Sequence, residues 1–562
     1  MQKESVGLPA FNLTALLDYF IIPLFLILAV YDLNFVRGFI DYFEAGKELA
    51  CVNELFRGKV LYRDIYSHFG PLNIYLEAWA LLIFGKSLAV LRAYFYIGTI
   101  STLIIFYLIS LKLCRSRVFA YASAFFLAVE TFHPFWSSRW GGFRFTAGAL
   151  AVLFAINFFQ SGKGRWLLLS GLFSGVSFLI TFDVGILSCV AVGSGLFLFV
   201  LIKHFNGEAI PLKSLALFVT GTLCVMVPFL VYFLSIGALF PYLNTLITTA
   251  KCQGGTWAIP DLDLRDYLYF SKILSCDFKY VISLSIYAVI ALVIARRIRT
   301  KKVSWVDYAI LSLMAYGFLM LIVKVTAKRL LMGPQFQMAF QPAVVLGFVF
   351  IDILSERIRA LRKYGSAGRD MFKLVSLIII FSISVSYFLF SDKRFYGSLI
   401  SWGFYETNKN CFMPIYSGGI PLSKMSLSTL TIDRAKGVIV PSDQAGEIEG
   451  VVKYMISKTR SNEPVFSFPE HGIFNFFIDR PCVDRFTIPG FALVPGEWRR
   501  ELLVDLEKVK PKYAIYSRRL SNLAMAANRD QEILPEIAQY IFTYYHKEAS
   551  FGLIDVWRRN NS

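Results

Sequence analysis

The chain has 562 residues, of which 56% are hydrophobic and only 17% are charged, and its formal net charge is +18. Soluble domains carry about 25% charged residues, so this composition excludes an ordinary soluble protein and indicates helices that face lipid. Nucleic-acid binding needs basic residues gathered on one folded face, whereas here they stand in short loops between apolar segments, so no nucleic-acid partner is expected.

The first apolar segment predicts an uncleaved membrane span over about residues 13–35, because it is long and lacks the small-residue cleavage site of a secretory signal peptide. Basic residues then recur in every second loop and predict which loops are cytoplasmic. These loops hold Lys112, Arg115 and Arg117; Lys163 and Arg165; Lys203 and Lys213; Arg296, Arg297, Arg299, Lys301 and Lys302; and Arg357, Arg359, Arg362, Lys363, Arg369 and Lys373.

The intervening segments are therefore expected on the outer side: 36–86, 133–142, the turn at Asp183, 238–278 and 328–337. The pattern predicts an all-α polytopic domain over 1–392, with about eleven spans, in the plasma or inner membrane. An odd number of spans that starts inside places residues 393–562 outside, as an extracytoplasmic domain.

The outer segment after the first span is long and predicts two helices along the membrane surface. Apolar residues recur three and four positions apart over 42–56, which predicts an amphipathic helix with Lys47, Glu48 and Glu54 away from its apolar stripe. Gly70-Pro71 begins a second apolar helix of about 13 residues, too short to span the bilayer.

Further along the chain, G-L-F-S-G at 171–175 is a small-xxx-small pattern typical of closely packed helices. Segment 250–270 is long and polar enough to gate a donor cavity. Asp261 and Asp263 within it are candidate ligands of a divalent metal ion, and metal dependence stays open. The eight cysteines form no C-x-x-C pair that would indicate a zinc or haem site. Two pairs of cysteines on the expected outer side are candidate disulfides: Cys252 with Cys276, and Cys411 with Cys482.

After residue 392 the chain is less apolar and predicts a small α/β domain. Strand-like runs lie at 437–440, 464–468, 512–517 and 552–557. Ser442 is expected to cap a helix with one apolar face, formed by Ile448, Val452, Met455 and Ile456. This domain contains no glycine-rich phosphate loop, so its expected role is to cover the outer face of the membrane domain or to bind an acceptor.

Four motifs in the first outer segment resemble the GT-C glycosyltransferases, membrane enzymes that transfer sugars from polyprenyl-phosphate donors, in particular protein mannosyltransferases and aminoarabinose transferases. They are D-Y-F-E-A-G at 41–46, R-G-K-V-L-Y-R-D at 57–64, H-F-G-P-L at 68–72 and F-G-K-S-L-A-V-L-R at 84–92. The resemblance implies two juxtamembrane helices, an outer α/β domain and a catalytic acid soon after the first span. The tail lacks the W-W-D motif of oligosaccharyltransferases, which disfavours transfer of a preassembled oligosaccharide to asparagine.

The resemblance implies that Asp41 is the general base, with Glu44 one helical turn later as the alternative. The same spacing resembles a helix capping box, so a purely structural role for both acids stays open. Asp64, Tyr62 and His68 are candidate contacts to the sugar or the acceptor. Asp64 has a plainer alternative, an ion pair with a neighbouring loop base such as Arg63.

Glycosyl transfer also needs positive charge at the departing phosphate. The candidates are the outer basic residues that charge topology does not require: Arg139, Arg144, Lys328 and Arg329. Each of them has an alternative role, in which its side chain extends to lipid headgroups. Asp183 at the outer turn is a further, weaker candidate for substrate binding.

The sequence therefore predicts an inverting glycosyltransferase that moves a sugar from a polyprenyl-phosphate donor to an extracytoplasmic glycan, lipid or protein. No certain cofactor is expected besides the lipid-linked donor. A transporter or flippase is the alternative, and it predicts ionisable residues deep within spans and an internal repeat, neither of which is evident. An O-antigen-ligase-like enzyme would carry its large outer loop late in the chain.

Overall fold

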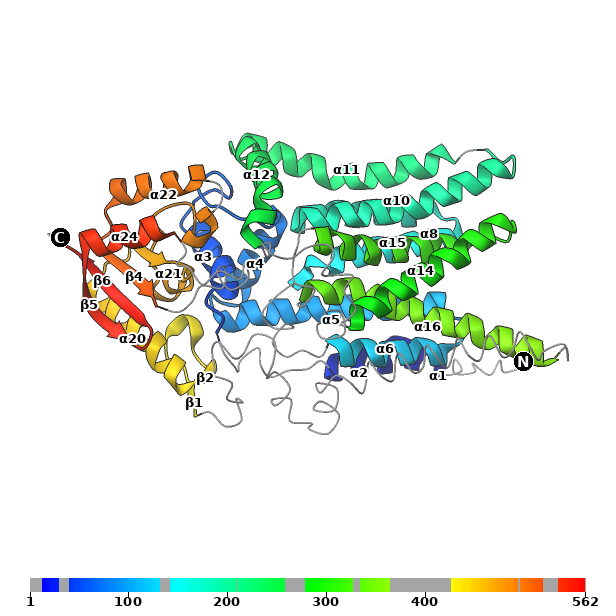
Figure 1. Ribbon diagram of the computed structural model, residues 1–562, viewed down its shortest axis with the longest axis horizontal. Helices are drawn as coiled ribbons and strands as arrows, with labels where there is room; N and C mark the ends of the chain where they lie inside the picture. Colours follow the sequence, from blue (N-terminus) through cyan, green and yellow to red (C-terminus); the bar gives the residue numbers. More distant parts are fainter. Residues whose placement is uncertain are drawn as a thin grey trace, which may run out of the picture.

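The computed structural model describes residues 13–29, 40–131, 142–209, 211–257, 278–326, 334–363, 426–493, 496–518 and 534–560. A bundle of long helices forms one end of the molecule and a smaller α/β domain forms the other, with α3 and α4 between them (Figure 1). The predicted domain boundary at 392/393 lies outside the described residues.

The bundle is built from apolar helices that run along its long axis (Figure 1). Five of the described helical segments are long and apolar enough to cross a membrane, and shorter apolar helices accompany them, so the predicted count of about eleven spans is not confirmed. The bundle elements are α1 Leu13–Leu16, η1 Leu17–Ile21, α2 Ile22–Ala29, α5 Leu88–Leu113, α6 Arg117–Thr131, α8 Thr146–Ser161, α9 Gly164–Ile180, α10 Phe182–Phe205, α11 Leu212–Ser235, α14 Phe278–Arg299, α15 Trp305–Thr326 and α16 Pro334–Lys363. A further helix, α12 (Leu239–Trp257), lies across the end of the bundle near the α/β domain (Figure 1).

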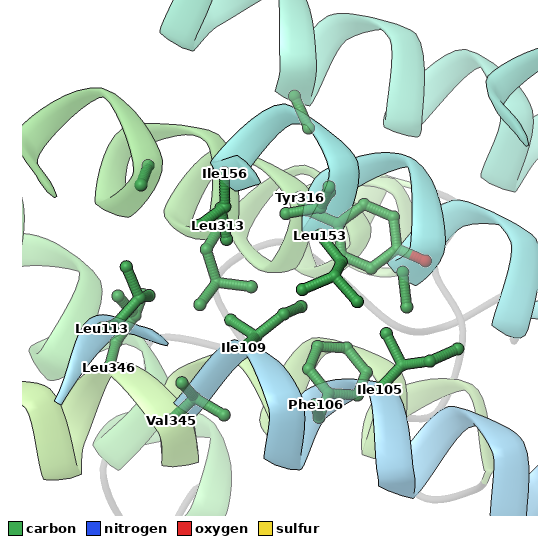
Figure 2. Close-up of a cluster of buried hydrophobic side chains, with 14 of the residues drawn as sticks. Ile105, Phe106, Ile109, Leu113, Leu153, Ile156, Leu313, Tyr316, Val345 and Leu346 are labelled. Atoms are coloured by element: carbon green, nitrogen blue, oxygen red, sulfur yellow. The ribbon is translucent and has the colours of Figure 1, made fainter. Parts of the chain in front are cut away.

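The bundle core lies between α5, α8, α15 and α16. Large aliphatic and aromatic side chains from these four helices meet there, as Figure 2 shows, and van der Waals packing among them holds the helices together, because lipid is as apolar as this core. The labelled members are Ile105, Phe106, Ile109, Leu113, Leu153, Ile156, Leu313, Tyr316, Val345 and Leu346.

The small-xxx-small pattern of α9 is confirmed as a packing device. A Cβ atom at Gly171 would lie 2.0 Å from the carbonyl oxygen of Phe218 on α11, and one at Gly175 would lie 2.9 Å from that of Thr222. Larger side chains at these positions would force the two helices apart, so the glycines set their close approach.

The two helices of the first outer segment are confirmed, as α3 (Glu44–Phe56) and α4 (Pro71–Phe84). The expected surface location of α3 is wrong in one respect, because its polar residues are buried: Lys47 is 5% exposed, Glu48 4% and Glu54 0%. Glu54 contacts Cys482 of the α/β domain, whereas Lys47 packs on Phe69 of the same outer segment, and local periodicity could not reveal either contact. The α4 helix instead exposes apolar side chains at its end, among them Leu82, Ile83 and Phe84.

The α/β domain has two sheets. Strands β1 (Leu427–Thr429) and β2 (Ile439–Pro441) pair antiparallel, and a second sheet has the order β3-β4-β6-β5. In the second sheet β3 is parallel to β4 and the other pairs are antiparallel. Its strands are β3 Val465–Phe468, β4 Tyr513–Ser517, β5 Tyr545–Phe551 and β6 Ile554–Arg559. The helical elements of the domain are η6 Asp433–Ala435, α20 Ser442–Lys458, α21 Ile473–Ile478, η7 Pro489–Leu493, α22 Gly496–Val509 and α24 Pro535–Tyr544.

All four predicted strand regions are confirmed, and the sequence did not predict β1 or β5. Ile448, Val452 and Met455 are buried on α20 as predicted, whereas Ile456 is 51% exposed, so its assignment to the apolar face is wrong. The cap is also different, because the Ser442 hydroxyl contacts the hydroxyls of Ser426 and Ser428 and caps no backbone N–H of its helix.

Specific contacts dock the α/β domain onto the first outer segment. The Gln444 side chain exchanges two hydrogen bonds with the backbone of Ile40, at 3.0 and 2.8 Å. Glu54 accepts from the backbone N–H of Cys482 at 2.9 Å and pairs with Lys59 at 2.6 Å. A Cβ atom at Gly46 would lie only 3.0 Å from the backbone nitrogen of Ile473, so α3 and α21 are in backbone contact.

We expect Gly46→Leu to loosen this docking, because the added side chain must push α21 away, at a cost of about 1–3 kcal/mol. The midpoint of thermal unfolding in detergent should fall and protease cleavage between the two bodies should speed up. Gly193→Leu on α10 is the matched control, since a Cβ there meets no described atom within 4 Å. Equal effects of the two substitutions would contradict the packing role of Gly46.

The predicted orientation can be tested with two serines that are both exposed. Ser461 belongs to the α/β domain and Ser161 ends α8 at the remote end of the bundle. Ser461→Cys should react with a membrane-impermeant maleimide on intact cells, whereas Ser161→Cys should react only after permeabilisation, with the unmodified protein as background. The reverse labelling pattern would overturn the orientation.

Candidate functional site

The candidate site lies where α3 begins, beneath the α/β domain. Asp41 is 8% exposed, and its Oδ1 accepts hydrogen bonds from the backbone N–H groups of Phe43 and Glu44, each at 3.0 Å. These are N–H groups of the first helical turn, which have no partner within the helix, so Asp41 stabilises the start of α3. The prediction that Asp41 caps the helix is thus confirmed. Capping does not decide whether Asp41 also acts as a base.

Glu44 does not reach back to close a reciprocal capping box. Its carboxylate forms a close ion pair with Lys47, one turn further along α3, and the Lys47 ammonium also lies 3.9 Å from Glu48. Burial raises the pKa of Glu44, and the Asp41 carboxylate adds to this, while Lys47 opposes it. A carboxylate with a raised pKa is a better proton acceptor near neutral pH.

Lys47 itself stays cationic in this buried place. Burial alone would lower the pKa of its ammonium group, but the carboxylates of Glu44 and Glu48 outweigh burial, so the pKa lies above its ordinary value. The site therefore keeps a fixed positive charge next to its acids.

A second cation comes from the bundle. The Arg144 guanidinium lies 5.3 Å from the centre of the Phe69 ring, and the Lys47 ammonium lies 4.8 Å from the centre of the same ring. Arg144 is also paired with Asp183 of α10 at 2.9 Å. Residues far apart in the sequence thus bring two cations to one aromatic side chain.

Close backbone contacts fix the segments that carry these groups. A Cβ at Gly98 of α5 would lie 2.1 Å from the backbone of Gly142, so α5 holds the short helix η3 (Gly142–Arg144) in place. A Cβ at Gly70 would lie 2.2 Å from the carbonyl oxygen of Leu179, and the Gly70 N–H donates to Ile180 at 2.9 Å. Only glycine allows this approach, which sets Phe69 beside the turn between α9 and α10.

Three of the predicted substrate contacts have structural partners in this structure. Arg63 binds both carboxylate oxygens of Asp64, at 3.0 and 2.9 Å, which matches the plainer alternative, and these hydrogen bonds lower the pKa of Asp64. The buried Tyr62 donates its hydroxyl to the carbonyl of Phe69 at 2.5 Å. The His68 ring contacts Phe69 and, from the α/β domain, Phe491. These residues shape the loop that presents Phe69.

Several sequence predictions lie outside the described residues: Arg139, Lys328 and Arg329, the pair Asp261 and Asp263, and the cysteines Cys276 and Cys411. The side chain of Cys252 is likewise not described. Cys482 is a buried free thiol. Within the described ranges, no three His, Cys, Asp or Glu residues are grouped to hold a metal ion.

The sequence reading missed Lys47 and Phe69 as members of the site. Lys47 was assigned only to the polar side of an amphipathic helix, and an isolated phenylalanine in an apolar protein carries no signal. The i, i+3 spacing of Glu44 and Lys47 was the available clue, because it predicts an ion pair on a helix.

No family model matches the sequence, and no curated protein matches it. Solved structures match nearly the whole chain. The apo crystal structure of ArnT from Cupriavidus metallidurans matches with a TM-score of 0.51 at 13% identity, covering 96% of this chain and 97% of that one. The apo oligosaccharyltransferase of Archaeoglobus fulgidus gives a TM-score of 0.49 at 13% identity, over 98% and 74% of the two chains. The match to ArnT shows that the two chains share a fold.

The pairing of Arg144 with Asp183 predicts a measurable energetic coupling. Asp183→Asn and Arg144→Gln should each lower the thermal unfolding midpoint, because each leaves a mostly buried charged group without its ionic partner. The double variant should lose less than the sum, with a coupling of about 0.5–3 kcal/mol. Strictly additive losses would show that the two side chains do not support each other.

Proposed function

We propose that this protein is a membrane glycosyltransferase that moves one sugar from a polyprenyl-phosphate donor to an acceptor on the extracytoplasmic side. The observation that carries the proposal is a linked cluster: Lys47 and Arg144 share the Phe69 ring, Lys47 pairs with Glu44, and Asp41 accepts the Glu44 N–H. Glycosyl transfer needs a base for the acceptor and positive charge for the phosphate. Both kinds of group meet here, beneath the α/β domain and at the end of a bundle of apolar helices. The fold shared with ArnT supports the proposal.

The reaction is a displacement at the anomeric carbon. The acceptor hydroxyl gives its proton to a carboxylate while its oxygen bonds to the anomeric carbon, and the bond from that carbon to the phosphate oxygen breaks. The bonding electron pair leaves with the lipid phosphate, whose added negative charge needs a cation. A single displacement inverts the configuration at the anomeric carbon.

Asp41 is the proposed base, with Glu44 as the alternative. The two backbone N–H groups fix the orientation of the Asp41 carboxylate, which suits a base that must meet the acceptor in one geometry. Glu44 has the raised pKa that favours proton uptake, but its carboxylate is already committed to Lys47. The orienting amides favour Asp41.

Lys47 and Arg144 are the proposed phosphate-binding cations. Arg144 offers a planar two-donor group and Lys47 a compact charge, and phosphate sites use both types. Asp183 holds the Arg144 guanidinium in place before the donor arrives, which reduces the entropy lost on binding. A lipid-linked donor can reach these cations without leaving the bilayer, because they lie where the apolar helices end (Figure 1).

A transporter or flippase would use ionisable groups within its spans for translocation. Three buried carboxylates of the bundle have partners that hold its remote end together. Asp18 pairs with Arg117, Asp307 pairs with Arg297, and Asp352 accepts from the backbone N–H groups of Arg115 and Ser116. In each contact the partner lies in a loop that the sequence predicts to be cytoplasmic, at Arg117, at Arg297 or at Arg115 and Ser116, so these acids serve packing, which favours the enzyme over the transporter.

Variants of Asp41 can separate catalysis from capping. Asp41→Asn keeps an oxygen that accepts the N–H groups of Phe43 and Glu44 but loses the basic carboxylate. We expect it to retain the wild-type unfolding midpoint and to lose about 100-fold or more in the rate of sugar transfer from polyprenyl-phosphate sugars. Asp41→Ala should lose both activity and stability.

Glu44→Gln is the comparison that locates the base. If transfer persists in Asp41→Asn but stops in Glu44→Gln, the base lies one turn further along α3. Wild-type turnover in both variants would remove the catalytic assignment from this helix.

A further inference from the structure

Behind the proposed base lies a second pair of acids that the displacement does not use. Glu48 of α3 is 4% exposed and Glu77 of α4 is 0% exposed. Asn73 donates to one oxygen of Glu77 at 2.7 Å. The other Glu77 oxygen and one oxygen of Glu48 are buried without a hydrogen-bond partner among the described residues.

Among the described residues, Lys47 is the cation that forms an ion pair with a member of this pair, and it is already shared. It forms its close ion pair with Glu44, and its ammonium lies 3.9 Å from the other Glu48 oxygen. One ammonium group cannot neutralise Glu44, Glu48 and Glu77 together. Among the described residues, the titratable groups that act on the pair are Asp41 just before α3; Glu44, Lys47 and Cys51 of α3; Glu48 and Glu77 themselves; and Tyr94 of α5.

Two buried carboxylates, each with an unpartnered oxygen and with one shared ammonium between them and Glu44, lose hydration that nothing replaces, which favours the protonated form. Burial raises the pKa of Glu48 to about 8, although Lys47 opposes the shift. Burial and the neighbouring Glu48 hold the pKa of Glu77 well above its usual range. The geometry and the electrostatics thus agree on a neutral pair.

We propose that Glu48 and Glu77 stay protonated at neutral pH and act as positioning residues, which keep Lys47 committed to Glu44 and to the donor phosphate. This inference rests on the proposed function. With both acids neutral, the site holds the carboxylates of Asp41, Glu44 and Asp183 against the cations Lys47 and Arg144. Ionisation of Glu48 adds a negative charge beside an anionic donor and offers Lys47 a second carboxylate.

The consequence is a specific alkaline limit on activity. As pH rises through the pKa of Glu48, the protonated form is lost, Lys47 is drawn from Glu44, and the donor phosphate is repelled. The kcat/KM for the lipid-linked donor should therefore fall above about pH 8, mainly through a higher KM.

The test compares pH profiles of donor kcat/KM for the unmodified protein, Glu48→Gln and Glu449→Gln. Glutamine at 48 mimics the protonated acid, so the alkaline fall in kcat/KM should disappear or move to higher pH by about one unit or more. Glu449 pairs with Lys453 on the surface of α20, and Glu449→Gln should leave the profile as it is. An alkaline fall that is identical in Glu48→Gln and the unmodified protein would overturn the proposal.

Infrared difference spectra give a second readout that needs no glycosyl transfer. The unmodified protein at neutral pH should show the C=O stretch of protonated carboxyl groups, and Glu48→Gln and Glu77→Gln should each remove part of that band. Loss of the band on raising the pH should follow the alkaline fall in activity. A missing band would overturn the neutral pair even if sugar transfer is confirmed, whereas a band without any transfer would refute only the proposed function.

Discussion

The burial of α3 between the membrane bundle and the α/β domain constrains everything else in the molecule. A helix with this many charges is stable in such a place only if each charge is paired, hydrogen-bonded or neutralised. The structure uses all three solutions: Glu54 is paired with Lys59 and accepts the Cys482 N–H of the α/β domain, Asp41 accepts backbone N–H groups, and Glu48 favours its protonated form.

The same constraint explains why the site is preorganised. Lys47 cannot move freely because Glu44 and the Phe69 ring hold it, and Arg144 is held by Asp183 and the same ring. Glycines at 70 and 98 let the supporting backbones approach closely enough to fix both cations. A site that must stabilise developing negative charge benefits from charges that are already in place.

The two ends of the bundle use charge differently. At the end remote from the α/β domain, buried carboxylates such as Asp18 and Asp307 each have an arginine partner, so they serve packing and topology. At the end near the α/β domain, acids outnumber bases along α3, and their burial raises the pKa of Glu44 and Glu48. The proposed lipid-linked donor would bring its own negative charge to Lys47 and Arg144.

The sequence by itself determined the apolar helices, the two helices of the first outer segment and all but one strand of the larger sheet of the α/β domain. These features depend on periodicity, glycine and proline signals, which are local. Asp41 and Glu44 were candidates because of a motif in the first outer segment. Arg144 was a candidate because it is an outer basic residue that the positive-inside pattern does not require. Only the tertiary structure decided that the charges of α3 are buried, that Lys47 and Arg144 share one ring, and that Asp64 binds Arg63. Burial and pairing depend on which distant segments pack together, and no local spacing records that.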